Sequence, residues 1–295
     1  MLRRPAILAC ACAAILALAP ATAAGQPPKR FYVSLGDSYA AGWQPTGVGQ
    51  GRNTRNGFAY QVPAIAARRG YRLVLVNFGC AGATTTSLIE RKGCPPVALG
   101  PGGRAYPQRT QLAAAERFLR THRRRTALVS VSIGGNDVTA CARAADPVSC
   151  VATAATTIRR NVTTIASRLR RAAGRKVRIV GTTYPDVLLG AWVNGDPASQ
   201  SLAGLSVIAF QSLINPALRQ AYRSAGARFV DVTAASGAYT PFDRVTTLYP
   251  YGTVPVAVAR VCELSYYCAF RDIHLRTDGY RLIADLVARR LPRRR

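Results

Sequence analysis

Histidine, methionine and tryptophan are scarce in this chain of 295 residues, which has two histidines, one methionine and two tryptophans. The histidines, His122 and His274, lie far apart, and no two cysteines have the Cys-x2-Cys spacing of a structural zinc site. Both absences count against a metal centre. We therefore expect no bound metal and no cofactor.

Acidic residues are also few: 13 Asp and Glu stand against 40 Lys and Arg, giving a formal net charge of +27. Such a balance favours an anionic partner. Nucleic-acid binding needs a basic stripe with interleaved aromatics, whereas the arginines here are scattered apart from runs at 123–125 and 293–295. We predict a monomer that binds no nucleic acid, with an anionic membrane or envelope surface as a possible partner.

Long apolar runs are missing after the first 24 residues. Arg3 and Arg4 precede an apolar run at 5–20 and small residues at 21–24, which is the pattern of a cleaved secretory signal peptide. A retained anchor is the alternative, but the run is shorter than the roughly 20 residues that span a bilayer. No linker divides the rest, so we predict a signal peptide at 1–24 and one secreted, extracellular domain at 25–295.

Six of the eight cysteines remain once Cys10 and Cys12 leave with the signal peptide. An even number in an exported chain indicates disulfides, and the spacing favours three local bonds. The predicted pairs are Cys80–Cys94, Cys141–Cys150 and Cys262–Cys268.

Short runs rich in Val and Ile alternate with segments of helical periodicity. The runs that read as buried strands are 31–35, 72–77, 127–133, 177–182 and 228–232. The helical segments are 58–69, 111–120, 150–173, 200–224 and 277–290, whereas 79–107 and 234–271 look irregular. Strands separated by helices predict an α/β/α domain with a central, mostly parallel five-stranded sheet.

Chemistry-bearing residues follow the predicted strands. Ligands bind beyond the carboxyl ends of strands in such sheets. Gly36-Asp37-Ser38 follows the first strand, 77–84 follow the second, and 134–137 (Gly-Gly-Asn-Asp) follow the third; His274 precedes the last helix. A serine, a base and hydrogen-bond donors at corresponding positions are what acyl transfer requires.

These four blocks, in this order, resemble the SGNH (GDSL-type) hydrolases over about residues 31–291, and most closely their secreted actinobacterial lipase/esterase branch. The resemblance implies a flavodoxin-like fold and makes Ser38 the nucleophile, with His274 as its general base. It implies an oxyanion hole formed by the backbone N–H groups of Ser38 and Gly82 and by the side chain of Asn136. Asp37 is expected to be structural.

The third member of the catalytic triad is where the sequence departs from the family. The family places an aspartate three residues before the histidine, but Arg271 is there and Asp272 is only two before it. Either Asp272 orients His274 from a shifted position, or a backbone carbonyl does so. The spacing favours the carbonyl, which predicts less than about tenfold loss of turnover in Asp272→Asn.

Three functions compete at this point. The first is a carboxylic ester hydrolase acting on lipid acyl esters or phospholipids, and the second is a carbohydrate esterase that removes acetyl groups. The third is a basic envelope-binding protein without catalysis, which has no need to keep Ser38, Gly82, Asn136 and His274 together. Six aromatic residues are candidates for lining an acyl pocket: Trp43, Trp192, Tyr249, Tyr251, Tyr266 and Tyr267.

Overall fold

The computed structural model describes residues 26–139, 141 and 144–294. The signal peptide predicted at 1–24 lies outside these residues, and so do Cys10 and Cys12.

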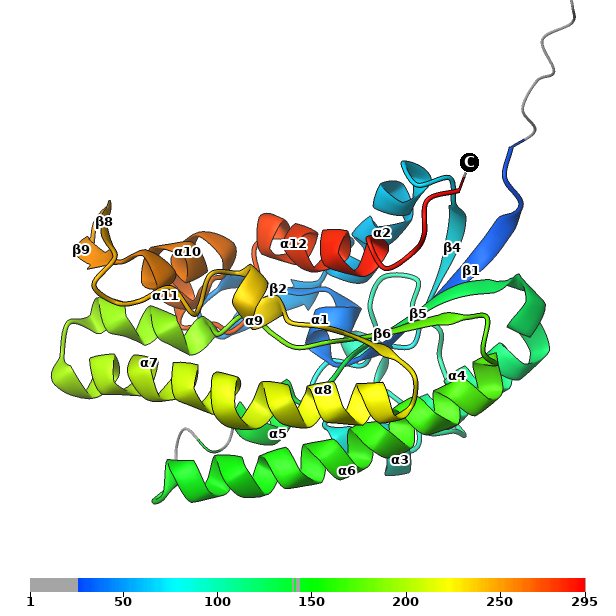
Figure 1. Cartoon of the computed structure of the whole chain (residues 1–295), viewed down its shortest axis with the longest axis horizontal. Coiled ribbons are helices and arrows are strands. Elements are labelled where there is room, and N and C mark those ends of the chain that lie inside the picture. Colours follow the sequence, from blue (N-terminus) through cyan, green and yellow to red (C-terminus); the bar gives the residue numbers. More distant parts are fainter. Residues whose placement is uncertain (1–25, 140, 142–143, 295) are drawn as a thin grey trace, which may run out of the picture.

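Five strands of the described chain form one sheet in which every neighbouring pair is parallel (Figure 1). The strands are β1 (Lys29–Gly36), β4 (Arg72–Asn77), β5 (Thr126–Ser132), β6 (Arg178–Thr182) and β7 (Arg228–Val230). Their order is β4-β1-β5-β6-β7. The chain moves outward from β1 to β4 and then returns to the other side of β1, so the strand order reverses between β1 and β5. This is the flavodoxin-like order, and ligands bind at its reversal point.

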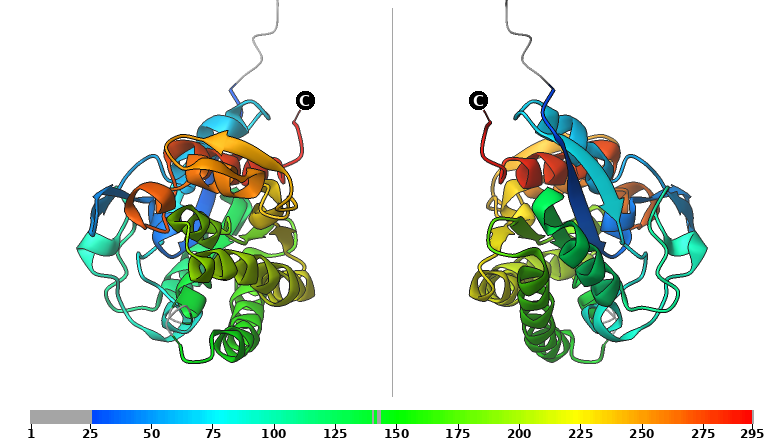
Figure 2. Two further views of the ribbon diagram at one scale, coloured as in Figure 1. Left: turned by 90° about the vertical axis from the view of Figure 1, so that its left-hand side faces the viewer. Right: turned by 90° about the vertical axis from the view of Figure 1, so that its right-hand side faces the viewer.

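Alternate residues of the strands face two hydrophobic cores. Val33 and Leu35 of β1 belong to the core under α4 (Gln111–His122), α6 (Pro147–Ala173) and α8 (Asn215–Ser224). Tyr32 belongs to the opposite core, under α2 (Phe58–Ala67) and α12 (Thr277–Ala288). Both views in Figure 2 show α12 on one side of the sheet and α6 on the other. The predicted three-layer α/β/α class is confirmed.

The helix predicted at 200–224 begins earlier and contains a local irregularity. Asp196 caps α7 (Pro197–Ala209), a π-helical turn follows at η5 (Phe210–Ile214), and α8 continues from it. Pro216 cannot donate a backbone hydrogen bond to the preceding turn, and a wider turn accommodates that loss. By length and composition, the continuous segment Pro197–Ser224 is apolar enough to cross a membrane. However, Ala203, Leu218 and other residues in it are buried against the rest of the domain.

The two stretches predicted as irregular contain short elements. The first, 79–107, contains α3 (Thr85–Glu90) and η1 (Pro96–Ala98). The second, 234–271, begins inside α9 (Val232–Ala235). It contains a hairpin of β8 (Val245–Leu248) and β9 (Gly252–Pro255), followed by α10 (Val256–Leu264) and α11 (Tyr267–Phe270). These helices and strands are too short to be recognised from the spacing of apolar residues. The other short elements are α1 (Ser38–Ala41), β2 (Trp43–Gly47), β3 (Gln50–Asn53), η2 (Arg123–Arg125), α5 (Gly135–Thr139) and η4 (Val187–Asn194).

Three disulfides join described cysteines in the predicted pairs, Cys80–Cys94, Cys141–Cys150 and Cys262–Cys268. The first ties the start of the segment after β4 to the loop beyond α3. The second ties the segment after α5 to the first turn of α6, and the third joins α10 to α11. All three therefore restrain loops or short helices outside the central sheet.

Candidate active site

The turn after β1 fixes the position of Ser38. Gly36 has φ 140°, and a Cβ there would lie 2.0 Å from the carbonyl oxygen of Ser132 at the end of β5, so only glycine fits. The side chain of Gln111 accepts the Gly36 N–H at 2.7 Å and donates to its carbonyl at 3.0 Å. The N–H of Asp37 in turn donates to Ser132 O at 3.1 Å. These hydrogen bonds fix the backbone directly before Ser38, which is the first residue of α1.

Asp37 has the structural role that was expected for it. Its carboxylate caps α1 by accepting the Tyr39 N–H at 3.0 Å, and it also accepts the hydroxyl of Tyr184. Burial raises the pKa of Asp37 to about 7, although these two hydrogen bonds act in the opposite direction. It has no hydrogen bond to His274 among the described residues.

Ser38, His274 and Asp272 form a continuous hydrogen-bonded chain. Nε2 of His274 lies 2.8 Å from Ser38 Oγ, and Nδ1 lies 2.7 Å from Asp272 Oδ1. Burial acts to raise the pKa of Asp272, but the hydrogen bonds and charge of His274 outweigh it and hold that pKa below its ordinary value. The geometry allows a proton to pass from the serine to the imidazole while the carboxylate holds the ring.

The expectation that a backbone carbonyl contacts Nδ1 is wrong, because the carboxylate of Asp272 does so. Oδ1 also accepts the backbone N–H of His274 at 2.8 Å. An aspartate whose side chain binds the N–H two residues later forms an Asx turn, which accounts for the short spacing. Arg271, with φ 56°, is the one described non-glycine residue in the left-handed region, and it ends α11 just before this turn.

The predicted oxyanion donors lie on three segments. Ser38 and Asn136 line the same cavity, whereas Gly82 does not line it. Asn136 Nδ2 donates to the carbonyl of Ala83 at 2.9 Å, which links α5 to the Gly82 segment and leaves one amide hydrogen for another acceptor. Within the described chain, the backbone N–H groups of Ser38 and Gly82 donate to no other backbone group. Gly82 has φ 80°, which favours glycine although nothing lies near a Cβ there.

His122 is far from this chemistry. Its ring stacks on Phe118 with centroids 4.2 Å apart, and Nδ1 is 3.0 Å from the Phe118 carbonyl. It packs at the end of α4 as a structural residue.

Two side chains that the sequence did not single out hold the histidine segment. The hydroxyl of Tyr39 donates to the carbonyl of Ile273 at 2.6 Å, and Gln44 Nε2 donates to the carbonyl of Leu275 at 3.1 Å. The carbonyls on both sides of His274 are thus bound by residues that follow Ser38 closely in the chain. No sequence signal marks either residue, because both contacts span more than 230 positions.

An apolar cavity of about 450 Å³ opens at Ser38. Its walls come from the start of α6, from α7 and from η5, including Val151, Leu202, Leu205 and Phe210. Of the described residues that line it, only Asp37 is of a charged type, and it lies on the floor. The six aromatic residues considered as pocket candidates are all absent from its lining, although the Trp43 ring lies 6.0 Å from that of His274.

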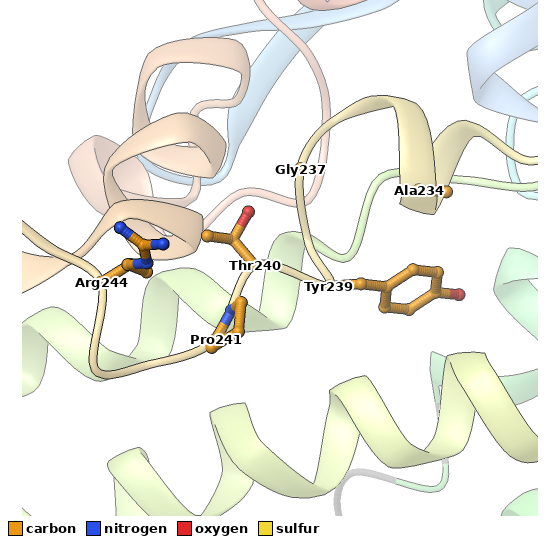
Figure 3. A pocket seen from close by; sticks show the side chains of 6 residues that line it. All are labelled: Ala234, Gly237, Tyr239, Thr240, Pro241 and Arg244. Carbon is orange, nitrogen blue, oxygen red and sulfur yellow. The ribbon is translucent and has the colours of Figure 1, made fainter.

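A larger hollow, about 670 Å³, lies around the loop after α9 (Figure 3). Its lining includes Tyr239 and Arg244, which extend in different directions, and neither Ser38 nor His274. It has no nucleophile paired with a base. In the described part of the chain, no three His, Cys, Asp or Glu side chains are grouped to hold a metal ion.

Two solved structures with TM-scores of at least 0.50 share this fold. The lipase Lip_vut3 from a goat rumen metagenome is 13% identical, with TM-score 0.52 over 90% of this chain and 99% of that one. A catalytic mutant of Axe2, an acetylxylan esterase from Geobacillus stearothermophilus, is 15% identical, with TM-score 0.50 over 89% and 94%. An extracellular lipase from Streptomyces rimosus is 18% identical, with TM-score 0.45 over 87% and 99%. At these identities the likeness concerns the fold alone, and a search of curated proteins found no match.

Membership of a family rests on a different comparison. Residues 34–282, most of the chain, match the GDSL-like lipase/acylhydrolase family model, and the match includes both Ser38 and His274. The chain belongs to this family, the SGNH hydrolases.

Proposed function

We propose that the protein is a secreted carboxylic ester hydrolase that forms an acyl-enzyme on Ser38. The observation that supports this most directly is the chain of hydrogen bonds from Ser38 Oγ through His274 to Asp272. A binding protein without catalysis has no use for this arrangement. The order of these contacts, from Ser38 Oγ through the two ring nitrogens of His274 to the Asp272 carboxylate, supports a separate catalytic role for each residue.

In the first half-reaction, His274 Nε2 takes the hydroxyl proton as Ser38 Oγ attacks the ester carbonyl carbon. The resulting tetrahedral oxyanion accepts hydrogen bonds from the N–H groups of Ser38 and Gly82 and from the Asn136 amide. The intermediate collapses, the bond to the alcohol oxygen breaks, and the imidazolium gives its proton to the departing alcohol. Water then attacks the acyl-enzyme with His274 again as base, releasing the acid and restoring Ser38.

Asp272 acts on this cycle through His274. Its carboxylate holds the proton on Nδ1, so that Nε2 faces Ser38 with a lone pair, and it stabilises the imidazolium that forms.

The cavity favours lipid acyl esters or phospholipids as substrates. It is large enough for a ligand of many carbon atoms, and its walls are almost wholly apolar. An acetyl group would leave most of those walls unfilled, and a sugar would find few polar partners there. The carbohydrate esterase is therefore the weaker candidate.

Export is part of the proposal. Three disulfides among the described cysteines suit an oxidising compartment, and they would persist poorly in a reducing one. The predicted signal peptide at 1–24 supplies the route.

A series of aryl esters of increasing acyl length tests both reaction and substrate, with acetylated xylan oligomers and a phospholipid beside it. We expect kcat/KM to rise about threefold to fourfold per added methylene until the cavity is filled. Ser38→Ala should abolish turnover while circular dichroism stays unchanged. Turnover in Ser38→Ala would refute the mechanism, and a maximum at acetyl would refute the substrate assignment.

A further inference from the structure

Apolar side chains are exposed where the Ser38 cavity reaches the surface. Val148 of α6 is 60% exposed, and Leu205 and Ile208 of α7 are 49% and 58% exposed. All three also line the cavity, so they form its outer edge. We refer to Val148, Leu205 and Ile208 as the mouth rim. Large apolar side chains that are exposed to solvent at one site indicate a binding surface.

The segments that carry the mouth rim contain no charged residue. Residues 147–158 and 197–218 lack Asp, Glu, Lys and Arg, although the whole chain has 40 Lys and Arg. Only 33% of the most apolar part of the helix Pro197–Ser224 is buried inside the protein. The first cations on α6 are Arg159 and Arg160, beyond the uncharged part.

The inner face of α7 packs against the domain and leaves the opposite face of the helix exposed. Ala203 and Ser206 are buried against the domain, and the Ser206 hydroxyl donates to the buried carboxylate of Asp186 at 2.8 Å. Leu205 and Ile208 lie on the opposite side of the same helical turns. A helix with one packed face and one apolar exposed face suits the interface of a lipid layer.

We infer that the mouth rim docks on the surface of a lipid aggregate, an inference that rests on the proposed lipid ester hydrolysis. The mouth rim is uncharged although the chain as a whole is strongly basic, and an uncharged apolar surface is complementary to the hydrocarbon of a lipid layer. The rim is also continuous with the cavity, so an acyl chain can pass from the lipid layer to Ser38 without crossing water. Because the mouth rim and the cavity form one apolar surface, a lipid suits this site better than a protein partner does.

Apolar contact, not charge, provides the specific part of this docking. The carboxylates nearest in sequence to the mouth rim are Asp146 and Asp196, which cap α6 and α7 and are exposed. They oppose attraction to an anionic surface at this point. The net positive charge of the chain attracts anionic lipid through any face, and that attraction is screened by salt.

The experiment measures partition of the Ser38→Ala protein onto phosphatidylcholine vesicles at high salt, where charge attraction is suppressed. Substrate turnover does not enter this readout, so failure here is distinguishable from failure of the proposed function, which soluble esters test. We expect measurable binding that falls at least tenfold in Leu205→Asp and in Ile208→Asp. Leu205→Ser is the milder variant should an aspartate disturb folding, and it should lower binding about threefold to fivefold.

Val97→Asp and Val245→Asp are matched controls, because these valines are 80% and 57% exposed but do not line the cavity. They should bind as the Ser38→Ala parent does. Absence of binding by the parent would overturn the inference, and so would an equal loss in the control variants. Gel filtration that shows a dimer abolished by Leu205→Asp would also overturn it, since the mouth rim would then pair two copies of the chain.

Discussion

Asp272→Asn removes one negative charge beside His274 and keeps the shape of the side chain. Oδ1 of Asp272 accepts both the backbone N–H and the Nδ1–H of His274, at 2.8 and 2.7 Å. In the variant we expect the amide oxygen to occupy this position, because an NH₂ group there would face a backbone N–H donor. The imidazole then keeps the tautomer that accepts the Ser38 proton.

The loss is therefore the attraction between the carboxylate and the imidazolium that forms as Ser38 attacks. Two unit charges about 4 Å apart attract by about 4 kcal/mol at the effective dielectric constant near a protein surface. The Asp272 side chain is 22% exposed, and solvent screening reduces the value to about 2–3 kcal/mol. We expect kcat/KM to fall about 30- to 150-fold, more than the tenfold limit that the sequence suggested.

Steady-state kinetics on a soluble aryl ester measures this loss, with circular dichroism to verify folding and nitrogen chemical shifts to report the tautomer. Asp272→Ala should lose more activity, because both N–H groups lose their acceptor. A loss of less than threefold in Asp272→Asn would show that the carboxylate charge does not act on His274. A loss above a thousandfold with the tautomer inverted would show that the backbone N–H does not select the amide oxygen.

Three further predictions follow from individual contacts. Tyr39→Phe removes the bond to the Ile273 carbonyl and should lower kcat about tenfold with little change in KM; unchanged kcat would mean that this bond does not position His274. Burial raises the pKa of Asp186 to about 7, so its neutral form stabilises the fold below about pH 4 and this contribution is lost as pH rises through 7. Urea unfolding should therefore show Asp186→Asn more stable than the wild type at pH 8, by up to about 4 kcal/mol, and the difference should shrink toward pH 4. Reduction of the disulfides should lower the free energy of unfolding by about 2–3 kcal/mol each, and an unchanged melting temperature under reductant would contradict this.

The parts of the fold that are clearest in the sequence are the long, buried ones. β5, for example, is buried along its whole length, so its residues are selected for apolar character and read as a continuous run. The β8–β9 hairpin was missed, because four-residue strands on an exposed surface carry no such pattern. Ser38 and His274 were found because each stands in a short motif next to a regular element.

The residues that hold His274 in place could not be found in this way. Tyr39 and Gln44 act through single hydrogen bonds to backbone carbonyls. Every residue has such a carbonyl, so the acceptor leaves no signal in the sequence. Asp272 is a candidate in the sequence, but its contact with Nδ1 of His274 is not predicted, because spacing alone does not reveal an Asx turn. Arg271, which directly precedes this turn, has a left-handed conformation, which arginine adopts at a cost of about 1 kcal/mol or more.

The scarcity of acidic residues carries information of its own in retrospect. Four helices begin at an aspartate whose side chain accepts a backbone N–H of the first turn: Asp37, Asp146, Asp196 and Asp231. Asp137 accepts hydrogen bonds from the backbone N–H and from the hydroxyl of Thr85 and so joins α5 to α3. Asp186 accepts one from Ser206 and holds α7. In a chain with so few carboxylates, each of these has a defined acceptor role rather than a general solubilising one. Asp272, two residues from His274, conforms to that pattern, which gives a reason independent of family spacing to regard its carboxylate as part of the site.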